Sequence, residues 1–298
     1  MKSDPNKEVT TKILAQLNAG VTPWVRPWKS VQGGAPIGIP HNARSGRPYS
    51  GCNVFMLWME LDEHPDWWER PGFLTFKQAL EVGGNVKEGE HGTRIYFLGK
   101  AKKKVEDTLT GDVEERRFTF LKGYTVFHLS QCENITGTLA TPSDTDIEPL
   151  MREDMAEFYD TVGAKVRHGG NSAFYAPALD VIQMPSLEQF DAEQRYHATR
   201  LHETTHWTGA PTRLNRLERG VKYGDPKYAF EELVAELGAA LLSAELGVEG
   251  ELRHAEYVGH WIRLLQDHEA AFFSAASKAQ KAVEFIRERC LESRRECD

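Results

Sequence analysis

The sequence predicts an α+β protein built in two parts, and three observations support this. Residues 94–129 are rich in aromatic and β-branched residues, which is typical of strands. Residues 228–246 are rich in helix formers, with apolar residues at helical spacing. A stretch of Pro, Ser, Thr and Asp at 140–149 separates the two regions and reads as a linker.

Charge follows the same division. Residues 1–140 carry 18 Lys and Arg against 16 Asp and Glu, whereas residues 141–298 carry 18 against 28. The whole chain has a net charge of −8. An acidic surface binds polyanions poorly, while the first part permits such a partner. We therefore expect a mixed α/β domain over 1–140, a linker over 141–149 and a second domain over 150–298.

Location is inferred from what the chain lacks. No apolar run is long enough to span a bilayer, and the first residues lack the apolar core of a signal peptide. The four cysteines form no CxxC pair and read as reduced thiols. We expect a cytoplasmic protein without a membrane partner.

Six segments of the first part are expected to be regular. They are an amphipathic helix at 6–18, a buried helical turn or strand at 54–61, a helix that starts near 73 with Thr75 as its cap, and strands at 95–98, 117–121 and 124–129. A turn at 110–112 joins the first two strands.

Aromatic and basic residues alternate early in the chain. Trp24 and Trp28 flank Arg26, and Lys29 follows, in a stretch that two prolines keep extended. Such a pattern suits a single-stranded nucleic acid, because bases stack on indoles while phosphates pair with cations. The alternative is that both tryptophans pack in the core.

Further candidates for nucleic-acid contact lie in the glycine-rich loop at 42–53 and along the strands. The lysines of 100–104, with Arg116 and Arg117 opposite, would make the hairpin a basic arm, and the alternative is a charged edge that blocks aggregation. The complete set of candidates is Trp24, Arg26, Trp28, Lys29, Arg44, Arg47, Tyr49, Lys77, Lys102 and Lys103.

The second part contains the clearest chemical signal, His202-Glu203-Thr204-Thr205-His206. On a helix, which Gly209 and Pro211 would end, the two imidazoles lie one turn apart on one face. This HExxH spacing suits two nitrogen ligands of one Zn²⁺, with Glu203 as the general base for a water molecule.

The helix predicted over 228–246 supplies the third ligand. It is apolar enough to lie in the core, yet it carries Glu231, Glu232 and Glu236. Glu232 and Glu236 share a face, so one carboxylate can bind the metal while the other orients a ligand histidine. We assign Glu232 as the ligand and Glu236 as its outer partner, and the reverse assignment stays open.

The order of elements around these helices is that of a small zincin. A helix at 151–162 precedes strands at 173–175 and 180–184, expected as a short antiparallel sheet, and helices at 251–272 and 275–294 follow the glutamate helix. His197, His254, His260 and His268 have no partner at ligand spacing and are not expected to bind metal. Tyr223, Tyr228 and Arg213 are candidates for stabilising an oxyanion.

Several long motifs resemble a known family. VTPWVRPW, residues 46–53 and FLTFKQA resemble the N-terminal domain of ArdC-type antirestriction proteins, which is shared with TraC-type primases. The run from HGGNSAFYAPALDVIQMP through LHETTHWTGAPTRLNR to FEELVAELGAALL resembles the metallopeptidase-like domain that follows it. The resemblance covers nearly the whole chain. At position 236 many thermolysin-like zincins have Asp, which leaves the ligand choice between Glu232 and Glu236 open.

The resemblance implies a plasmid antirestriction protein that acts in conjugation, binds single-stranded DNA through its first domain and has a zincin-like second domain. The expected cofactor is Zn²⁺ or another divalent ion such as Mn²⁺, and the expected partners are single-stranded DNA and a protein substrate or restriction-enzyme component. The alternative is a protein that coats DNA without catalysis and uses the metal structurally. A nuclease or primase-like enzyme is disfavoured, since phosphoryl transfer usually uses carboxylate-rich Mg²⁺ sites.

Overall fold

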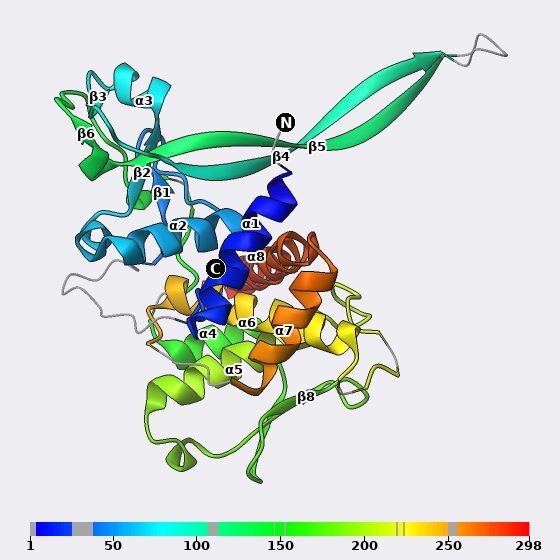
Figure 1. The fold of residues 1–298 in the computed structure, drawn as a ribbon. Helices are drawn as coiled ribbons and strands as arrows, with labels where there is room; N and C mark the ends of the chain where they lie inside the picture. Colours follow the sequence, from blue (N-terminus) through cyan, green and yellow to red (C-terminus); the bar gives the residue numbers. More distant parts are fainter. Residues whose placement is uncertain are drawn as a thin grey trace.

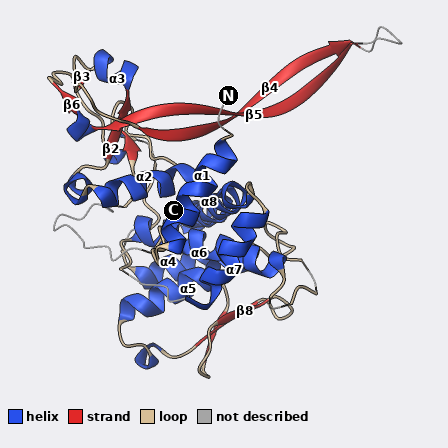
Figure 2. Cartoon of the chain, in the orientation of Figure 1, coloured by secondary structure: helices blue, strands red, loops and turns tan. Residues whose placement is uncertain are grey.

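A computed structural model describes residues 4–25, 38–106, 113–145, 147–151, 153–218, 220–222, 224–249 and 255–297. It shows a helical body from which one long β-hairpin extends into solvent (Figure 1). Most helices gather in the body, while the hairpin and the small sheets lie at its periphery (Figure 2). The expected α+β class is confirmed.

The first two helices form as amphipathic spacing predicts. Helix α1 (Pro5–Asn18) begins where the Asp4 side chain accepts a hydrogen bond from the Asn6 backbone, and it buries Val9, Ile13 and Leu17. Helix α2 (Cys52–Glu63) buries nearly every residue from Val54 to Leu61, so the ambiguous apolar segment is helical. Both helices therefore face the interior of the body.

Strand β2 (Gly72–Thr75) occupies the place where a helix was expected to start. Phe73 and Leu74 are fully buried and pair with strand β5 (Val113–His128), and this pairing overrides their helix-compatible pattern. Thr75 then caps helix α3 (Phe76–Glu81) through a capping box with Gln78, which confirms the predicted cap.

The first sheet has the order β1-β2-β5-β4. Strand β1 (His41–Asn42) runs parallel to β2, whereas the pairs β2–β5 and β5–β4 are antiparallel. Strand β4 (Thr93–Glu106) and β5 pair without interruption from Thr93↔Val126 to Glu106↔Val113. The expected three strands are thus two long ones, and the expected turn at 110–112 lies outside the described residues.

Gly123 does not divide β5, although the sequence suggested a break there. Its backbone pairs with Tyr96, and the guanidinium of Arg94 lies against it, so that a Cβ at Gly123 would come within 2.9 Å of Arg94 Nε. Strand β3 (Asn85–Val86) and strand β6 (Cys132–Glu133) form a second, antiparallel pair near α3. Short 3₁₀ turns lie at Pro65–Glu69, Leu129–Gln131, Pro142–Asp144 and Leu187–Gln189.

The second part contains a three-stranded sheet of order β7-β9-β8. Helix α4 (Met155–Val162) leads into β7 (Val166–His168), β8 (Phe174–Ala176) and β9 (Val181–Met184). Strand β7 was not expected, and because it runs parallel to β9 the sheet is mixed rather than antiparallel. Strand β8 lies at one edge of this sheet.

Four helices complete the body: α5 (Glu193–Thr208), α6 (Pro226–Leu246), α7 (Ala255–Asp267) and α8 (Ala271–Cys297). The break between α7 and α8 comes earlier than expected. There the Glu269 carbonyl accepts a hydrogen bond from Thr10 Oγ1 of α1 at 2.7 Å, a tertiary contact with no local sequence signal. No helix in the described ranges is long and apolar enough to cross a bilayer.

One apolar core joins the two halves of the chain. Trp24 is only 2% exposed and packs against Trp261 of α7 and Phe272 of α8, with ring centroids 5.5 and 6.0 Å away. Phe55 of α2 lies 5.8 Å from the same Phe272 ring. The division into domains at 141–149 stays a prediction about folding units. One large cluster contains buried residues from both sides of it, while a smaller cluster around Leu74 and Ala79 lies within the first part.

Candidate metal centre

Helices α5 and α6 pack closely beside the HExxH motif. At Gly238 of α6 an added Cβ would lie 2.5 Å from Thr205 Cγ2 of α5, so only glycine permits this approach. Thr205 is itself fully buried, and its hydroxyl donates to the Leu201 carbonyl within α5. This contact brings the histidine face of one helix against the glutamate face of the other.

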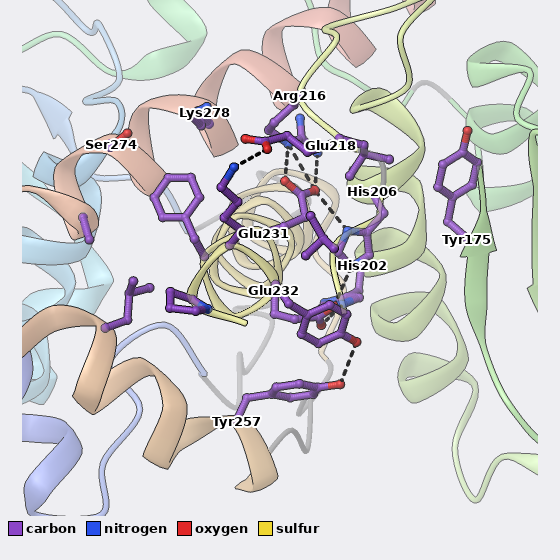
Figure 3. Close-up of a pocket in the computed structure, with 18 of the residues that line it drawn as sticks. Tyr175, His202, His206, Arg216, Glu218, Glu231, Glu232, Tyr257, Ser274 and Lys278 are labelled. Carbon is purple, nitrogen blue, oxygen red and sulfur yellow. Dashed lines mark hydrogen bonds and ion pairs between the residues drawn. The ribbon is translucent and has the colours of Figure 1, made fainter. Parts of the chain in front are cut away.

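Three predicted ligands converge at this contact (Figure 3). Nε2 of His202 lies 3.5 Å from one carboxylate oxygen of Glu232, and Nε2 of His206 lies 3.6 Å from the other. One donor atom from each residue lies within 4.8 Å of the other two. Two imidazoles and one carboxylate from separate helices thus lie together, in an arrangement that could hold a metal ion.

The spacing of these donors fits a divalent ion. A tetrahedral ion with ligand bonds near 2.0–2.1 Å has ligand–ligand distances of about 3.3–3.4 Å, close to the two nitrogen–oxygen distances here. The donor set of two imidazoles and one carboxylate suits Zn²⁺ and also other divalent transition metals. With three protein ligands, the site leaves a coordination position for water or substrate.

Both histidines have a second carboxylate behind them. Oε2 of Glu236 lies 3.5 Å from Nδ1 of His202, and Oε1 of Glu231 lies 3.1 Å from Nδ1 of His206. Such carboxylates orient a ligand imidazole and raise its basicity. The geometry therefore favours Glu232 as the ligand and Glu236 as its outer partner, and it adds Glu231, whose role the sequence reading missed.

Arg216 holds Glu231 in place. Its Nε and Nη2 donate to the two Glu231 oxygens at 2.8 and 2.9 Å, a bidentate pair. The same guanidinium donates to the Thr205 carbonyl and the Thr208 hydroxyl at the end of α5. The loop after the HExxH helix thus returns to fix the carboxylate that orients His206, and no local pattern in the sequence marks it.

Charge keeps the metal-free site protonated. Burial alone would lower the pKa of His206, but Glu231 and Glu232 outweigh it and raise the pKa to about 9. Burial also disfavours the imidazolium of His202, yet Glu232 and Glu236 raise its pKa well above the usual value. The pKa of Glu232 is lowered, because its hydrogen bonds to both histidines outweigh its burial. A metal ion that binds this site therefore displaces protons from the two histidines.

Glu203 and the metal ligands open onto a shared cavity of about 860 Å³. Its wall includes Phe174 and Tyr175 of the edge strand β8, together with residues of α6, α7 and α8 (Figure 3). Glu203 is largely buried beside His202. A general base, a metal site and an edge strand thus line one cavity.

The three candidates for stabilising an oxyanion lie in different places. Arg213 donates to Asp180, the Tyr175 hydroxyl and the Trp207 carbonyl and lines a separate cavity, so these contacts do not favour it as the oxyanion donor. Tyr228 lines the metal cavity, and its hydroxyl lies 3.2 Å from that of Tyr257. Tyr223 lies outside the described residues.

Those nucleic-acid candidates that the structure describes lie in separate places. Trp24 is an interior residue, so the packing alternative holds for it and no indole face is available to stack a base. Arg26, Trp28 and Lys29 lie outside the described residues. Tyr49 is half-buried against Phe73, and burial raises the pKa of its hydroxyl to about 12.

The remaining cations lie at two places. Arg44 and Arg47 are exposed in a turn that Asn42 stabilises, and Asn42 also bonds Gln78 of α3, the helix that carries exposed Lys77. On the hairpin, the backbone register sets Lys102 opposite Arg117 and Lys103 opposite Arg116, as predicted.

Sequence comparison identifies both parts. Residues 153–278 match the family described as zincin-like metallopeptidase, and residues 3–127 match the N-terminal domain of anti-restriction factor ArdC. The class is thus a zincin-like domain preceded by an ArdC-type N-terminal domain. The protein y4eC of Sinorhizobium fredii is 33% identical over 291 residues, which cover 95% of this chain and 92% of that protein.

Two crystal structures of the antirestriction protein ArdC from plasmid R388 share the fold. The metal-free structure has a TM-score of 0.78 and 35% identity, covering 97% of this chain and 99% of that one; the Mn(II)-bound structure has a TM-score of 0.76 and 33% identity, covering 97% and 98%. This chain belongs to the ArdC antirestriction family.

Longer relatives are similar to this chain over one segment of their length. A DNA primase TraC of Escherichia coli is 33% identical over 300 residues, which make up 96% of this chain but only 27% of the primase. The similarity therefore concerns this segment and not the whole primase.

Proposed function

We propose that this chain protects incoming plasmid DNA from restriction, binding single-stranded DNA and hydrolysing peptide bonds at a Zn²⁺ site. The observation that supports the peptidase activity most strongly is the convergence of His202, His206 and Glu232 beside Glu203 in an open cavity. A purely structural zinc site is usually closed by four protein ligands, whereas the described residues supply three here.

The mechanism follows from the position of Glu203. A divalent ion bound by the three ligands would lower the pKa of a water molecule and polarise a peptide carbonyl. Glu203 would act as the general base: it would accept a proton from the water whose oxygen adds to the peptide carbonyl carbon, and pass that proton to the amine nitrogen as the C–N bond breaks. Glu231 and Glu236 keep the two imidazoles oriented through their Nδ1 atoms.

The cavity offers the groups that a peptide needs. Strand β8 presents a free edge next to the site, and an extended peptide can add to such an edge by backbone hydrogen bonds. Tyr228 is the described candidate for donating to the oxyanion, because its hydroxyl lies at the cavity and Arg213 lies elsewhere. A Tyr228→Phe variant tests this role through kcat.

The experiment that tests the peptidase function is Glu203→Gln. We expect hydrolysis of a peptide library or of casein to fall about 10²–10⁴-fold, since loss of a general base has effects of this size. Metal content, measured by mass spectrometry, should remain at one ion per chain. Glu218→Gln is the matched control, since Glu218 lines the same cavity but pairs with Lys227. Equal hydrolysis by wild type and Glu203→Gln would refute the role.

The same variant distinguishes protection by proteolysis from protection by coating DNA. If protection of transferred DNA needs proteolysis, Glu203→Gln loses protection while single-strand binding persists. If protection persists, the chain acts by coating DNA and the metal site serves another purpose. The partners proposed here are single-stranded DNA and a protein substrate, such as a component of a restriction enzyme.

A further inference from the structure

The two faces of the β4–β5 hairpin differ at its base. Tyr96 is 4% exposed and packs against Phe273 of α8, with ring centroids 5.5 Å apart. Its neighbour Phe97 is 60% exposed. Because successive residues of a strand point to opposite faces, Tyr96 faces the helical body, while the opposite face is buried near the base at Ile95 and Val126 and exposed at Phe97.

The Phe97 face carries aromatic rings with a lysine between them. Phe97 pairs in register with Lys122, the next rung outward pairs Gly99 with Phe120, and the next rung inward pairs Ile95 with Tyr124. Paired residues lie on the same face of a ladder, as do those two residues away. Phe120 is 40% exposed and Tyr124 39% exposed. We call Phe97, Phe120, Lys122 and Tyr124 the stacking face.

Gly99 explains how Phe120 is held. A Cβ added at Gly99 would lie 2.4 Å from Cζ of Phe120 and 2.7–2.8 Å from both Cε atoms. The outer end of the ring therefore lies over the backbone of the opposite strand, in space that any other residue would fill. This contact positions the ring across the ladder while leaving two fifths of the side chain exposed.

Charge along the hairpin favours a polyanion as the occupant. Nζ of Lys122 lies 4.9 Å from the centroid of the Tyr124 ring, which places a cation among the rings. Further out, the backbone register sets Lys103 opposite Arg116 on a rung of the same parity as Phe97, whereas the rung of Lys102 and Arg117 belongs to the opposite face. Successive rungs on one face are about 6.8 Å apart, roughly twice the 3.4 Å rise per nucleotide of a duplex strand, which leaves room for a base between rings.

We propose that the stacking face is where the chain binds single-stranded nucleic acid, with bases against Phe97, Phe120 and Tyr124 and a phosphate at Lys122. This inference rests on the proposed single-strand binding and names its site. It replaces Trp24, which is buried, as a stacking platform. A duplex fits poorly, because its bases are already stacked and paired.

The test uses the full chain and a fluorescent oligothymidylate in an anisotropy titration. Phe97→Ala and Phe120→Ala should each weaken binding by roughly 5- to 150-fold, the effect of losing one stacked base. Phe76→Ala is the matched control, since Phe76 is 54% exposed on α3 and lies off the hairpin. Phe97→Trp should retain the binding that Phe97→Ala loses, whereas Phe97→Leu should not.

The contribution of charge is tested by titrations at several salt concentrations. Lys122→Ala should reduce the slope of log affinity against log salt by about 0.7, the value for one phosphate contact on a single strand. Lys281→Ala is the control, because Lys281 is an exposed lysine on α8. An unchanged slope in the Lys122 variant would argue against a phosphate contact there and overturn that part of the proposal.

The outcomes separate this inference from the proposed function. If wild type fails to bind single strands, single-strand binding itself fails. If wild type binds and the Phe97 and Phe120 variants bind equally well, single-strand binding survives and the stacking face is overturned. Loss of self-association in those variants during sedimentation, without a change in binding, would assign the face to a second copy instead.

Discussion

The metal centre and the hairpin place their functional groups in opposite ways. At the metal centre, α5 and α6 are packed on nearly all sides, and each ligand histidine has a carboxylate behind it. On the hairpin, two strands hold exposed side chains almost solely by pairing with each other. The first region should therefore respond to changes in packing and charge, whereas the second should tolerate them and respond only in ligand binding.

Acid should break the metal centre most strongly. Metal ligands must be neutral imidazoles, yet the carboxylates hold the pKa of metal-free His206 near 9 and that of His202 well above normal. Metal binding at pH 7 then releases protons, so affinity should rise with pH up to at least about 9, the pKa of His206. We expect about tenfold per pH unit for each proton displaced, or at least about 100-fold between pH 6 and 8, by calorimetry in buffers of different ionisation enthalpy.

Removing an outer carboxylate should weaken the site by a smaller amount. Glu231→Gln and Glu236→Gln should each reduce metal affinity about 10- to 100-fold, because each orients one ligand histidine. Arg216→Lys should resemble Glu231→Gln in direction, since a lysine cannot make the bidentate pair. Competition with a chromogenic chelator measures the affinity. An unchanged affinity in Glu231→Gln would mean that His206 needs no outer partner.

The close contact of α5 and α6 gives a test of packing. Gly238→Ala should lower the free energy of unfolding by about 1–3 kcal/mol, because the new methyl group meets Thr205 in a filled space. Gly259→Ala is the control. Its Cβ meets nothing within 4 Å, so this variant should gain about 0.5–1 kcal/mol from helix propensity. Urea denaturation measures both, and equal changes would show that the contact is loose.

The hairpin should show the smallest effect on stability. Phe97→Ala should change the free energy of unfolding by no more than about 0.5 kcal/mol, as is usual for an exposed residue. Phe55→Ala, a fully buried aromatic truncation in α2, should cost about 3–5 kcal/mol. A large loss in Phe97→Ala would show that the hairpin face is part of the folded core.

The same contrast explains how much the sequence could reveal. His202, His206 and Glu232 were predictable, because helical spacing alone sets which side chains share a face and a buried helix has few reasons to carry acids. Glu231 could have been found from its neighbour Glu232. Arg216 could not, since its role depends on a loop that returns to α5.

On the first part, short-range patterns were less informative. Trp24 and the exposed rings of Phe97 and Phe120 are equally aromatic in sequence, and only tertiary packing decides which is buried. The register of β4 on β5 likewise depends on fourteen paired positions rather than on one motif. Single cations on the hairpin were therefore predicted, while the aromatic row between them was not.

The packing of Trp24 against Trp261 and Phe272 has a consequence for how this segment can move between genes. Because those rings come from opposite ends of the chain, separating the two halves would expose an apolar surface on each. A gene rearrangement that moves the entire segment leaves that surface covered. In keeping with this, a DNA primase TraC of Escherichia coli matches 96% of this chain over a segment that makes up only 27% of the primase.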